Sequence, residues 1–101
     1  MEYLNSLSSN VIEINIRNKN LIILPDLSRF TCLQKLDCSI NQLTQLDNLP
    51  SSLKTLSCSF NNFTQLDNLS SSLLVLYCDN NQLTHLDNLP LFLNTLNCSN
   101  N

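Results

Sequence analysis

One eleven-position pattern recurs along the chain at intervals of twenty residues, and it constrains the fold more than any other feature. The pattern reads L-x-x-L-x-C-x-x-N-x-L, and its copies begin at Leu33, Leu53, Leu73 and Leu93. A unit this short holds one strand and one returning arm, so it cannot bury its apolar side alone. The pattern therefore predicts a solenoid in which each coil covers the next.

The spacing also predicts the shape of each coil. The Leu-x-Cys core of each copy is expected as a short strand that pairs in parallel with the next one. Pro50 and Pro90 hold the returning arms extended, and a twenty-residue coil leaves little room for a helix. We expect a leucine-rich repeat solenoid with short parallel strands on a concave face, extended or polyproline-like return arms on the convex side, and little or no helix.

The repeat divides a single domain, residues 1–101, into unequal units. The segment Leu4 to Val11 matches Leu46 to Leu53 position for position, which predicts a half-repeat that forms a partial cap. The expected units are the half-repeat 1–10, the repeats 11–32, 33–52, 53–72 and 73–92, and a truncated repeat 93–101. The open last unit leaves three alternatives: a fragment of a longer array, end-to-end pairing, or a marginal domain.

Two columns of identical residues follow from the period, and both have structural explanations. One column consists of the cysteines that replace the third Leu of each unit: Cys38, Cys58, Cys78 and Cys98. We expect these thiols to be reduced and to fill space in the core, although stacked neighbours would be close enough to form a disulfide. A column of amides is expected to pair the backbone at the bend after each strand: Asn41, Asn61, Asn81 and Asn101. The chain has no Gly, so Asn48, Asn68 and Asn88 are the expected corners with positive φ.

The stretch from Leu46 to Asn61 resembles the short leucine-rich repeats of bacterial secreted effectors, with Asp for the first Pro and Cys for Val. The combination of Cys with Asn-Asn-Gln-Leu-Thr and Leu-Asp-Asn-Leu-Pro is similar to leucine-rich repeat proteins of giant DNA viruses of amoebae. The resemblance implies protein binding, and a viral protein would act in the host cytoplasm.

Composition narrows the classes of function. A net charge of -3 gives no basic footprint for nucleic acid, and no apolar run approaches a membrane span. The first residues lack a signal-peptide pattern, so we expect an intracellular, cytoplasmic protein. Neither a nucleophile beside a base nor paired acids are evident, so we expect no enzyme, no cofactor and no metal site.

Side chains between the inward ones are expected on the exposed sheet face. Among them Tyr77 and Val75 are the best anchors, because both occupy positions that are otherwise small and polar. The candidate partner-binding residues are Lys35, Asp37, Ser57, Val75, Tyr77, Asp79 and Asn97. The hypothesis is a protein–protein interaction module with a protein partner; the alternative is an assembly unit that self-associates through its uncapped C-terminal end.

A further column, Asp47, Asp67 and Asp87, raises the question of a bound Ca²⁺. The preferred interpretation is that each Asp accepts a hydrogen bond from its own turn and faces solvent. His85 occupies the place of Gln45 and Gln65 and is expected as a surface residue.

Overall fold

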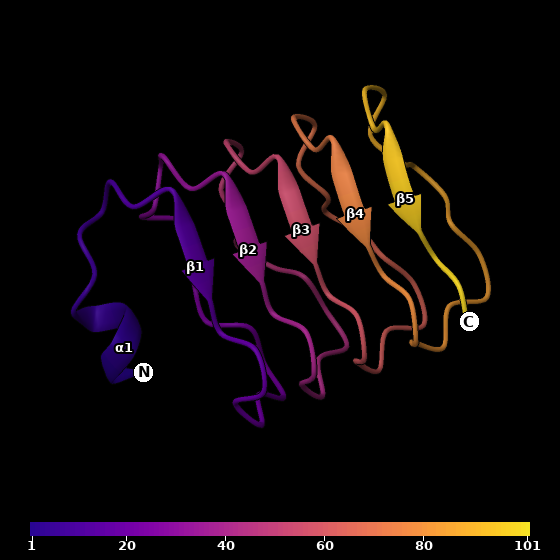
Figure 1. Ribbon diagram of the computed structural model, residues 1–101, viewed down its shortest axis with the longest axis horizontal. Helices are drawn as coiled ribbons and strands as arrows, with labels where there is room; N and C mark the ends of the chain where they lie inside the picture. Colours follow the sequence, from indigo (N-terminus) through magenta and orange to yellow (C-terminus); the bar gives the residue numbers. More distant parts are fainter.

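The computed structural model describes residues 1–101 and holds one five-stranded parallel sheet with its strands in chain order (Figure 1). The strands are β1 (Glu13–Asn15), β2 (Lys35–Asp37), β3 (Thr55–Ser57), β4 (Val75–Tyr77) and β5 (Thr95–Asn97). The only helix, α1 (Glu2–Asn5), lies beside β1 at one end of the row, and β5 lies at the other end. The expected solenoid with almost no helix is confirmed.

The strand register follows the sequence period. Leu36 pairs with Ile14 on one side and Leu56 on the other, and Leu76 continues the same row to Leu96. In β1 to β4 the middle residue is buried and its neighbours face outward, which is the alternation expected of a strand with one covered face. Each coil therefore adds one apolar row to a continuous core.

The core is one cluster of twenty buried residues that runs from Leu4 to Leu83. The central Leu of β2, β3 and β4 is fully buried, and each such side chain contributes roughly 1.5–3 kcal/mol to folding. Burial fades in the last coil, where Leu96 is 40% exposed although it occupies the same row. Leu89 is likewise 36% exposed at this end of the row of coils.

The corners of the coils use positive φ without any Gly. Asn48, Asn68 and Asn88 have φ values of 59°, 60° and 58°, as expected from the sequence. A second column also has positive φ, which was not expected. It lies one residue before the column of amides at Asn41, Asn61, Asn81 and Asn101, here called the Asn ladder, and at the matching place in the first coil: Asn18, Ile40, Phe60, Asn80 and Asn100. β-branched residues such as Ile40 avoid positive φ for steric reasons. The coil nevertheless requires a left-handed backbone at this position, so Ile40 adopts it.

The first ten residues differ from the predicted half-repeat. Residues Glu2–Asn5 form one helical turn, and Ser6 stays right-handed at φ -84°, where the matching Asn48 is left-handed. The later part does follow the repeat, because the Val11 N–H donates to the Ser8 carbonyl as Leu53 N–H does to Pro50. The N-terminal segment thus begins as a helix and joins the repeat geometry only at its end.

Arg29 fastens this segment to the first coil. Its guanidinium donates to the Leu4 carbonyl at 2.6 Å and lies 4.0 Å from the centre of the Phe30 ring. Leu4 is buried against the core, so α1 covers part of the β1 end. The structure contains no helix with the length and apolarity needed to cross a lipid bilayer.

Candidate partner-binding face

The outward side chains of the five strands form one surface, here called the sheet face, built from the first and third residue of each strand. The parallel register sets them in two rows. The first row is Glu13, Lys35, Thr55, Val75 and Thr95, and the second is Asn15, Asp37, Ser57, Tyr77 and Asn97. Six of the seven predicted partner-binding residues lie in these rows, and Asp79 follows β4 just beyond them.

Charges on the N-terminal half of the sheet face neutralise one another. Arg17 lies 3.1 Å from the Asp37 carboxylate, and Lys35 lies 3.8 Å from Glu13. These pairs are solvent-exposed, so each contributes at most about 1 kcal/mol to stability. Lys35 and Asp37 are therefore occupied within the chain, on β2, two strands away from Val75 and Tyr77.

The column of residues two positions after the strands is not an open surface in β2 and β3. Ser39 and Ser59 are buried, two residues after the ends of β2 and β3. The Ser39 hydroxyl pairs with that of Ser57 at 2.7 Å, and the Ser59 hydroxyl donates to the Asp79 carboxylate. The side chains of Ser57 and Asp79 are thus already hydrogen-bonded within the chain.

Asp79 is held in its charged form by these contacts. Partial burial alone would raise its pKa, but hydrogen bonds from Ser59, from Asn80 and from its own backbone N–H together lower it. A carboxylate with these donors in place is part of the bend after β4 and presents little free acceptor to a partner.

The C-terminal half of the sheet face is uncharged. Val75 is half-buried beside Thr55 and Thr95, while Tyr77 is 39% exposed between Ser57 and Asn97. The Tyr77 hydroxyl has no hydrogen-bond partner within the chain, and its ring rises among smaller neighbours. Val75, Tyr77, Ser57 and Asn97 are the candidate residues that the structure brings together.

Two ladders behind the sheet face fix its strands. The side-chain amide of Asn61 donates to the carbonyls of Cys58 and of Cys38 in the preceding coil, each at 3.1 Å. The Asn61 oxygen accepts from the Leu43 N–H at 3.0 Å. The other ladder amides repeat this arrangement: Asn41, Asn81 and Asn101.

The thiol ladder is buried in three coils and open in the fourth. Cys38, Cys58 and Cys78 are buried, Cys98 is exposed, and all are free thiols. Burial raises the pKa of Cys38 and of Cys78 to about 12, with nearby acidic groups adding to the shift. Burial also raises the pKa of Cys58 well above 9.0, so these sulfurs remain protonated and unreactive.

The acidic column lies on the return arms, and its contacts differ from the prediction. Asp67 accepts from Gln65 at 2.9 Å, Asp47 from Asn68 of the next coil at 3.4 Å, and Asp87 lies 3.7 Å from His85. Bonds from a residue two positions on, which were expected here, form instead at Asp26 and Asp37. No group of three or more His, Cys, Asp or Glu side chains is placed to hold a metal ion.

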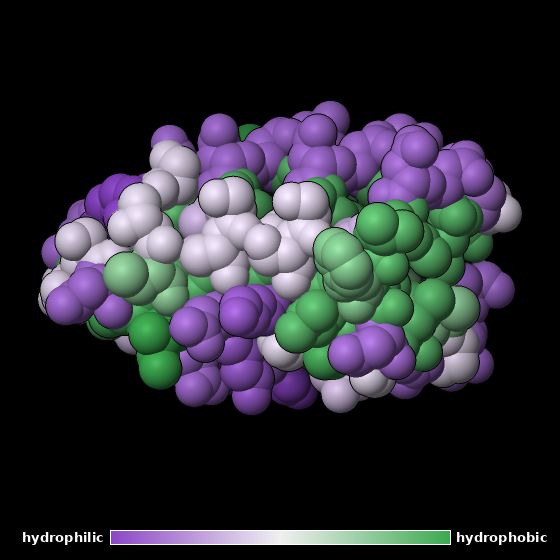
Figure 2. Space-filling model, turned by 90° about the horizontal axis from the view of Figure 1, so that it is seen from above, coloured by the Kyte–Doolittle hydropathy of each residue, from purple (hydrophilic) through white to green (hydrophobic).

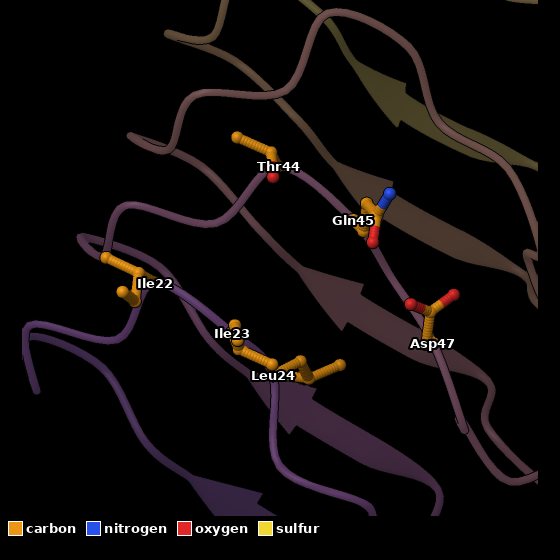
Figure 3. Close-up of a pocket in the computed structure, with 6 residues that line it drawn as sticks. All are labelled: Ile22, Ile23, Leu24, Thr44, Gln45 and Asp47. Carbon is orange, nitrogen blue, oxygen red and sulfur yellow. The ribbon is translucent and has the colours of Figure 1, made fainter.

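A small hollow separates the first two return arms (Figure 3). Figure 3 shows Ile22 and Ile23 on one arm and Thr44, Gln45 and Asp47 on the next. Its volume of about 60 Å³ has room for a few water molecules and no larger ligand. Ile22 and Ile23 replace the Thr-Gln pair of the next coil and are strongly exposed.

The sequence analysis missed one apolar feature. Leu91 and Phe92 precede β5 and are 87% and 69% exposed. Ser51-Ser52 and Ser71-Ser72 occupy the same positions in the two preceding coils, so the signal was present in the repeat alignment. Figure 2 shows the resulting gathering of apolar side chains at the C-terminal end of the molecule, next to side chains of intermediate hydropathy.

Comparison with known proteins is informative at the level of solved structures. No protein-family model and no curated protein matches the chain. Among solved structures, YopM from Yersinia enterocolitica WA-314 superposes with a TM-score of 0.81 at 39% sequence identity over 90% of this chain. The chain spans 20% of the length of that structure. The chain described here thus shares its parallel coils of about twenty residues with part of a much longer protein.

Proposed function

The chain belongs to the leucine-rich repeat proteins with short repeats of about twenty residues, and we propose that it binds a protein partner through the C-terminal half of its sheet face. The observation that carries this proposal is the pair Val75 and Tyr77 on β4. They place an aliphatic and an aromatic side chain on a face that is otherwise small, polar or internally paired.

Preorganisation supports the binding role. The backbone behind Val75 and Tyr77 is tied to both neighbouring coils, because Cys58 N–H donates to Tyr77 O and Cys78 N–H donates to Asn97 O. A face that is already ordered loses little conformational entropy when a partner docks. Tyrosine is enriched among the residues that dominate binding energy, since its ring buries a large area with few rotatable bonds.

The charge distribution favours a partner surface of apolar and neutral polar groups. The strand neighbours of Val75 and Tyr77 are small and uncharged, namely Thr55, Ser57, Thr95 and Asn97, and the Ser57 hydroxyl is already paired with that of Ser39. The charged side chains of β1 and β2 are paired with each other, so they discriminate against partners more than they attract them. The net charge of -3 supports a protein rather than a nucleic-acid partner.

We further propose binding rather than catalysis, in an intracellular setting. The three buried sulfurs are held as thiols by their raised pKa, which removes them as nucleophiles. Five free cysteines suit a reducing compartment such as the cytoplasm, which would be that of a host cell if the protein is viral.

A second candidate function is assembly through the C-terminal end. The observation that favours it is the C-terminal end of the array, where Leu89, Leu91, Phe92 and Leu96 are all exposed. Exposed apolar clusters of this kind mark interaction surfaces.

The first candidate is tested by giving β4 the residues of β3. The double variant Val75→Thr and Tyr77→Ser copies Thr55 and Ser57, so it preserves strand and register. For a partner captured on the immobilised chain from a cell extract, we expect its affinity to fall at least about tenfold. The matched control, Ile22→Thr with Ile23→Gln, removes two exposed apolar side chains from the return arm and should keep full affinity. An unchanged affinity for the β4 variant would reject the assignment.

A further inference from the structure

Two apolar side chains project from the bends that follow β2 and β3. Ile40 and Phe60, here called the rim pair, are 39% and 54% exposed, whereas the residues on either side of Phe60, Ser59 and Asn61, are buried. The Asn41 N–H donates to the Phe60 carbonyl, so the two bends lie side by side in adjacent coils. Figure 1 shows these bends beyond the arrowheads of β2 and β3. The rim pair thus lies within the array, with a complete coil on either side of it.

Neither rim residue suits the backbone that carries it. Both have positive φ, 55° for Ile40 and 53° for Phe60. The equivalent positions of the other coils hold Asn, a residue type that is enriched in this conformation: Asn18, Asn80 and Asn100. Burial within the chain does not offset the strain, because both side chains stay largely in water. Residues kept in a strained conformation of this kind cluster at functional positions. The burial that would offset the strain is therefore expected from a contact outside the chain.

The bend after β3 holds the Phe60 side chain on an ordered backbone. The Phe60 N–H donates to the Asp79 carbonyl at 3.1 Å, and the hydroxyl of the preceding Ser59 donates to the Asp79 carboxylate. The side-chain amide of the following Asn61 donates to carbonyls of its own coil and of the preceding coil. A ring carried by such a backbone loses little conformational entropy when it is docked.

The same backbone ladder joins the rim pair to the partner site on β4. The Cys58 N–H donates to the Tyr77 carbonyl at 2.8 Å, and two residues farther along both coils the Phe60 N–H donates to the Asp79 carbonyl. Strand spacing and the reach of the chain place the Cα atoms of Phe60 and Tyr77 within about 12 Å of each other. A protein interface buries about 800 Å² on each partner, several times the area that Val75 and Tyr77 offer. A patch of that area centred on Tyr77 includes Phe60.

The surroundings of the rim pair favour an uncharged protein surface as the occupant. The flanking side chains are amides, which hydrogen-bond without a charge: Asn18 and Asn80 in the same column, and Gln42 and Asn62 two residues farther along. Membrane surfaces that carry anionic lipids attract clusters of Lys and Arg. From Leu36 to Asn101 the only Lys or Arg is Lys54, which precedes β3 at the end away from the bend. Charge therefore disfavours a lipid surface at this place.

The shape of the surface favours a different protein over a second copy. Phe60 and Tyr77 both project, and the hollows of the molecule lie between the return arms or at the two ends of the row of coils. Two copies placed sheet face to sheet face would meet projection against projection. The residues that dominate an interface instead fill pockets of the partner. The occupant that fits is a protein that supplies the recess.

We propose that the rim pair is a second anchor of the partner site, and that the partner is a different protein whose uncharged, apolar recess receives the Phe60 ring, with Ile40 at the edge of that recess. The inference rests on the partner binding proposed above and deepens it, because it extends the site beyond β4 and states the chemistry of the partner. It also gives the strained residue types of these two bends a role in binding instead of folding.

Replacing the rim pair by the residue of the other coils tests the proposal. The variant Ile40→Asn with Phe60→Asn, here called the rim variant, copies Asn18, Asn80 and Asn100, so it keeps the left-handed bends and should unfold at no lower urea concentration than the original chain. The probe is the protein that is captured on the immobilised original chain and then purified. Its affinity for the rim variant should be at least about tenfold weaker.

Two further variants make the result specific. The matched control, Ile22→Thr with Ile23→Gln, also removes two exposed apolar side chains and should keep full affinity for the probe. An unchanged affinity of the folded rim variant would overturn the proposal, even where the β4 variant Val75→Thr with Tyr77→Ser loses binding. Loss in the rim variant with an unaffected β4 variant would support the rim pair and reject the β4 assignment, so the two fail separately.

A tryptophan at position 60 tests whether the ring enters a recess. The chain contains no Trp, so Phe60→Trp introduces a single indole. Addition of the probe protein should shift the indole emission to shorter wavelength and protect it from quenching by iodide, after subtraction of the spectrum recorded with the original chain. The control Ile23→Trp should show neither change. An indole at position 60 that stays open to iodide in the complex would overturn the proposal.

The other two occupants are tested on the chain alone. Sedimentation equilibrium should give the original chain and the rim variant the same mass at every concentration. Neither chain should bind vesicles of phosphatidylcholine, with or without phosphatidylserine. Self-association that the rim variant loses would assign the surface to a second copy, and vesicle binding that it loses would assign the surface to lipid. Either result would overturn the proposal.

Discussion

The side-chain amide of Asn61 donates a hydrogen bond to the backbone carbonyl of Cys38, one coil earlier in the chain, over 3.1 Å. The same amide group serves its own coil through Cys58, and its oxygen serves Leu43. The amide also donates to the Ser59 carbonyl at 3.2 Å, so one buried side chain pairs four backbone groups from two coils. The order of the sheet face depends on this ladder, because each strand is positioned by the bend that follows it.

We expect Asn61→Ala to lower the free energy of unfolding by about 3 kcal/mol, since it leaves buried backbone groups without partners. Asn101→Ala removes the same kinds of bonds at an exposed position, where water replaces them, and should cost below about 1 kcal/mol. Urea unfolding followed by circular dichroism measures both. Equal losses at the two positions would contradict the role of burial in the ladder.

The strain at Ile40 predicts a stabilising substitution. Ile40 has φ 55°, whereas the matching position two coils later is Asn80 with φ 56°. The left-handed conformation costs a residue such as Ile roughly 1–2 kcal/mol. We therefore expect Ile40→Asn to raise the free energy of unfolding by about 1 kcal/mol and Asn80→Ile to lower it. If Ile40→Asn destabilised the chain in urea unfolding, packing of the Ile side chain would outweigh its backbone strain.

The buried thiols predict a loss of stability at high pH. Their pKa is raised in the folded chain, to about 12 for Cys38 and Cys78, so only the unfolded chain loses these protons just above pH 9. The contribution is complete below pH 9 and falls as pH rises from 9 toward 12, by up to about 1.4 kcal/mol per pH unit for each thiol. Urea unfolding from pH 8 to 11 in reducing buffer measures this slope.

Two matched variants test whether the loss of stability with rising pH comes from the buried thiols. Cys58→Val removes one buried thiol and should make the decline with pH shallower, whereas Cys98→Val removes an exposed one and should leave the decline unchanged. All other titratable groups are the same in the original chain and in both variants, so they do not account for a difference between them. A slope that is identical for the two variants would assign the pH dependence to those other groups.

Periodicity predicted the parts of this fold that every coil must repeat. The strand centres, the inward Leu and Cys rows and the Asn ladder follow from one pattern, since stacking gives equivalent residues the same environment. The corners at Asn48, Asn68 and Asn88 were also predictable, because a chain without Gly leaves Asn as the residue best suited to positive φ. The sequence also singled out Val75 and Tyr77, whose strand neighbours in the structure are Thr55, Ser57, Thr95 and Asn97.

Features that depend on context were not predictable in the same way. The positive φ of Ile40 and Phe60 could not be predicted from these two residues, because neither type favours that conformation. The Asn residues at the equivalent positions 18, 80 and 100 were the available indication. Simple alternation would place Ser39 and Ser59 outside, but the strands end two residues earlier, so alternation no longer applies and both serines are buried. In the N-terminal segment the Leu spacing matched the repeat, but Ser6 donates its hydroxyl to the Tyr3 carbonyl and ends a helix instead of forming a corner.

The most direct test of the central claim is to place a photo-crosslinking amino acid at position 77 and, separately, at position 23. Both positions are exposed, one on the sheet face and one on the return arm, so the two chains differ in the surface they probe. We predict that the chain modified at Tyr77 crosslinks its captured protein partner and that the chain modified at Ile23 does not. Crosslinking through position 23 alone would place the partner on the return arms and contradict the account.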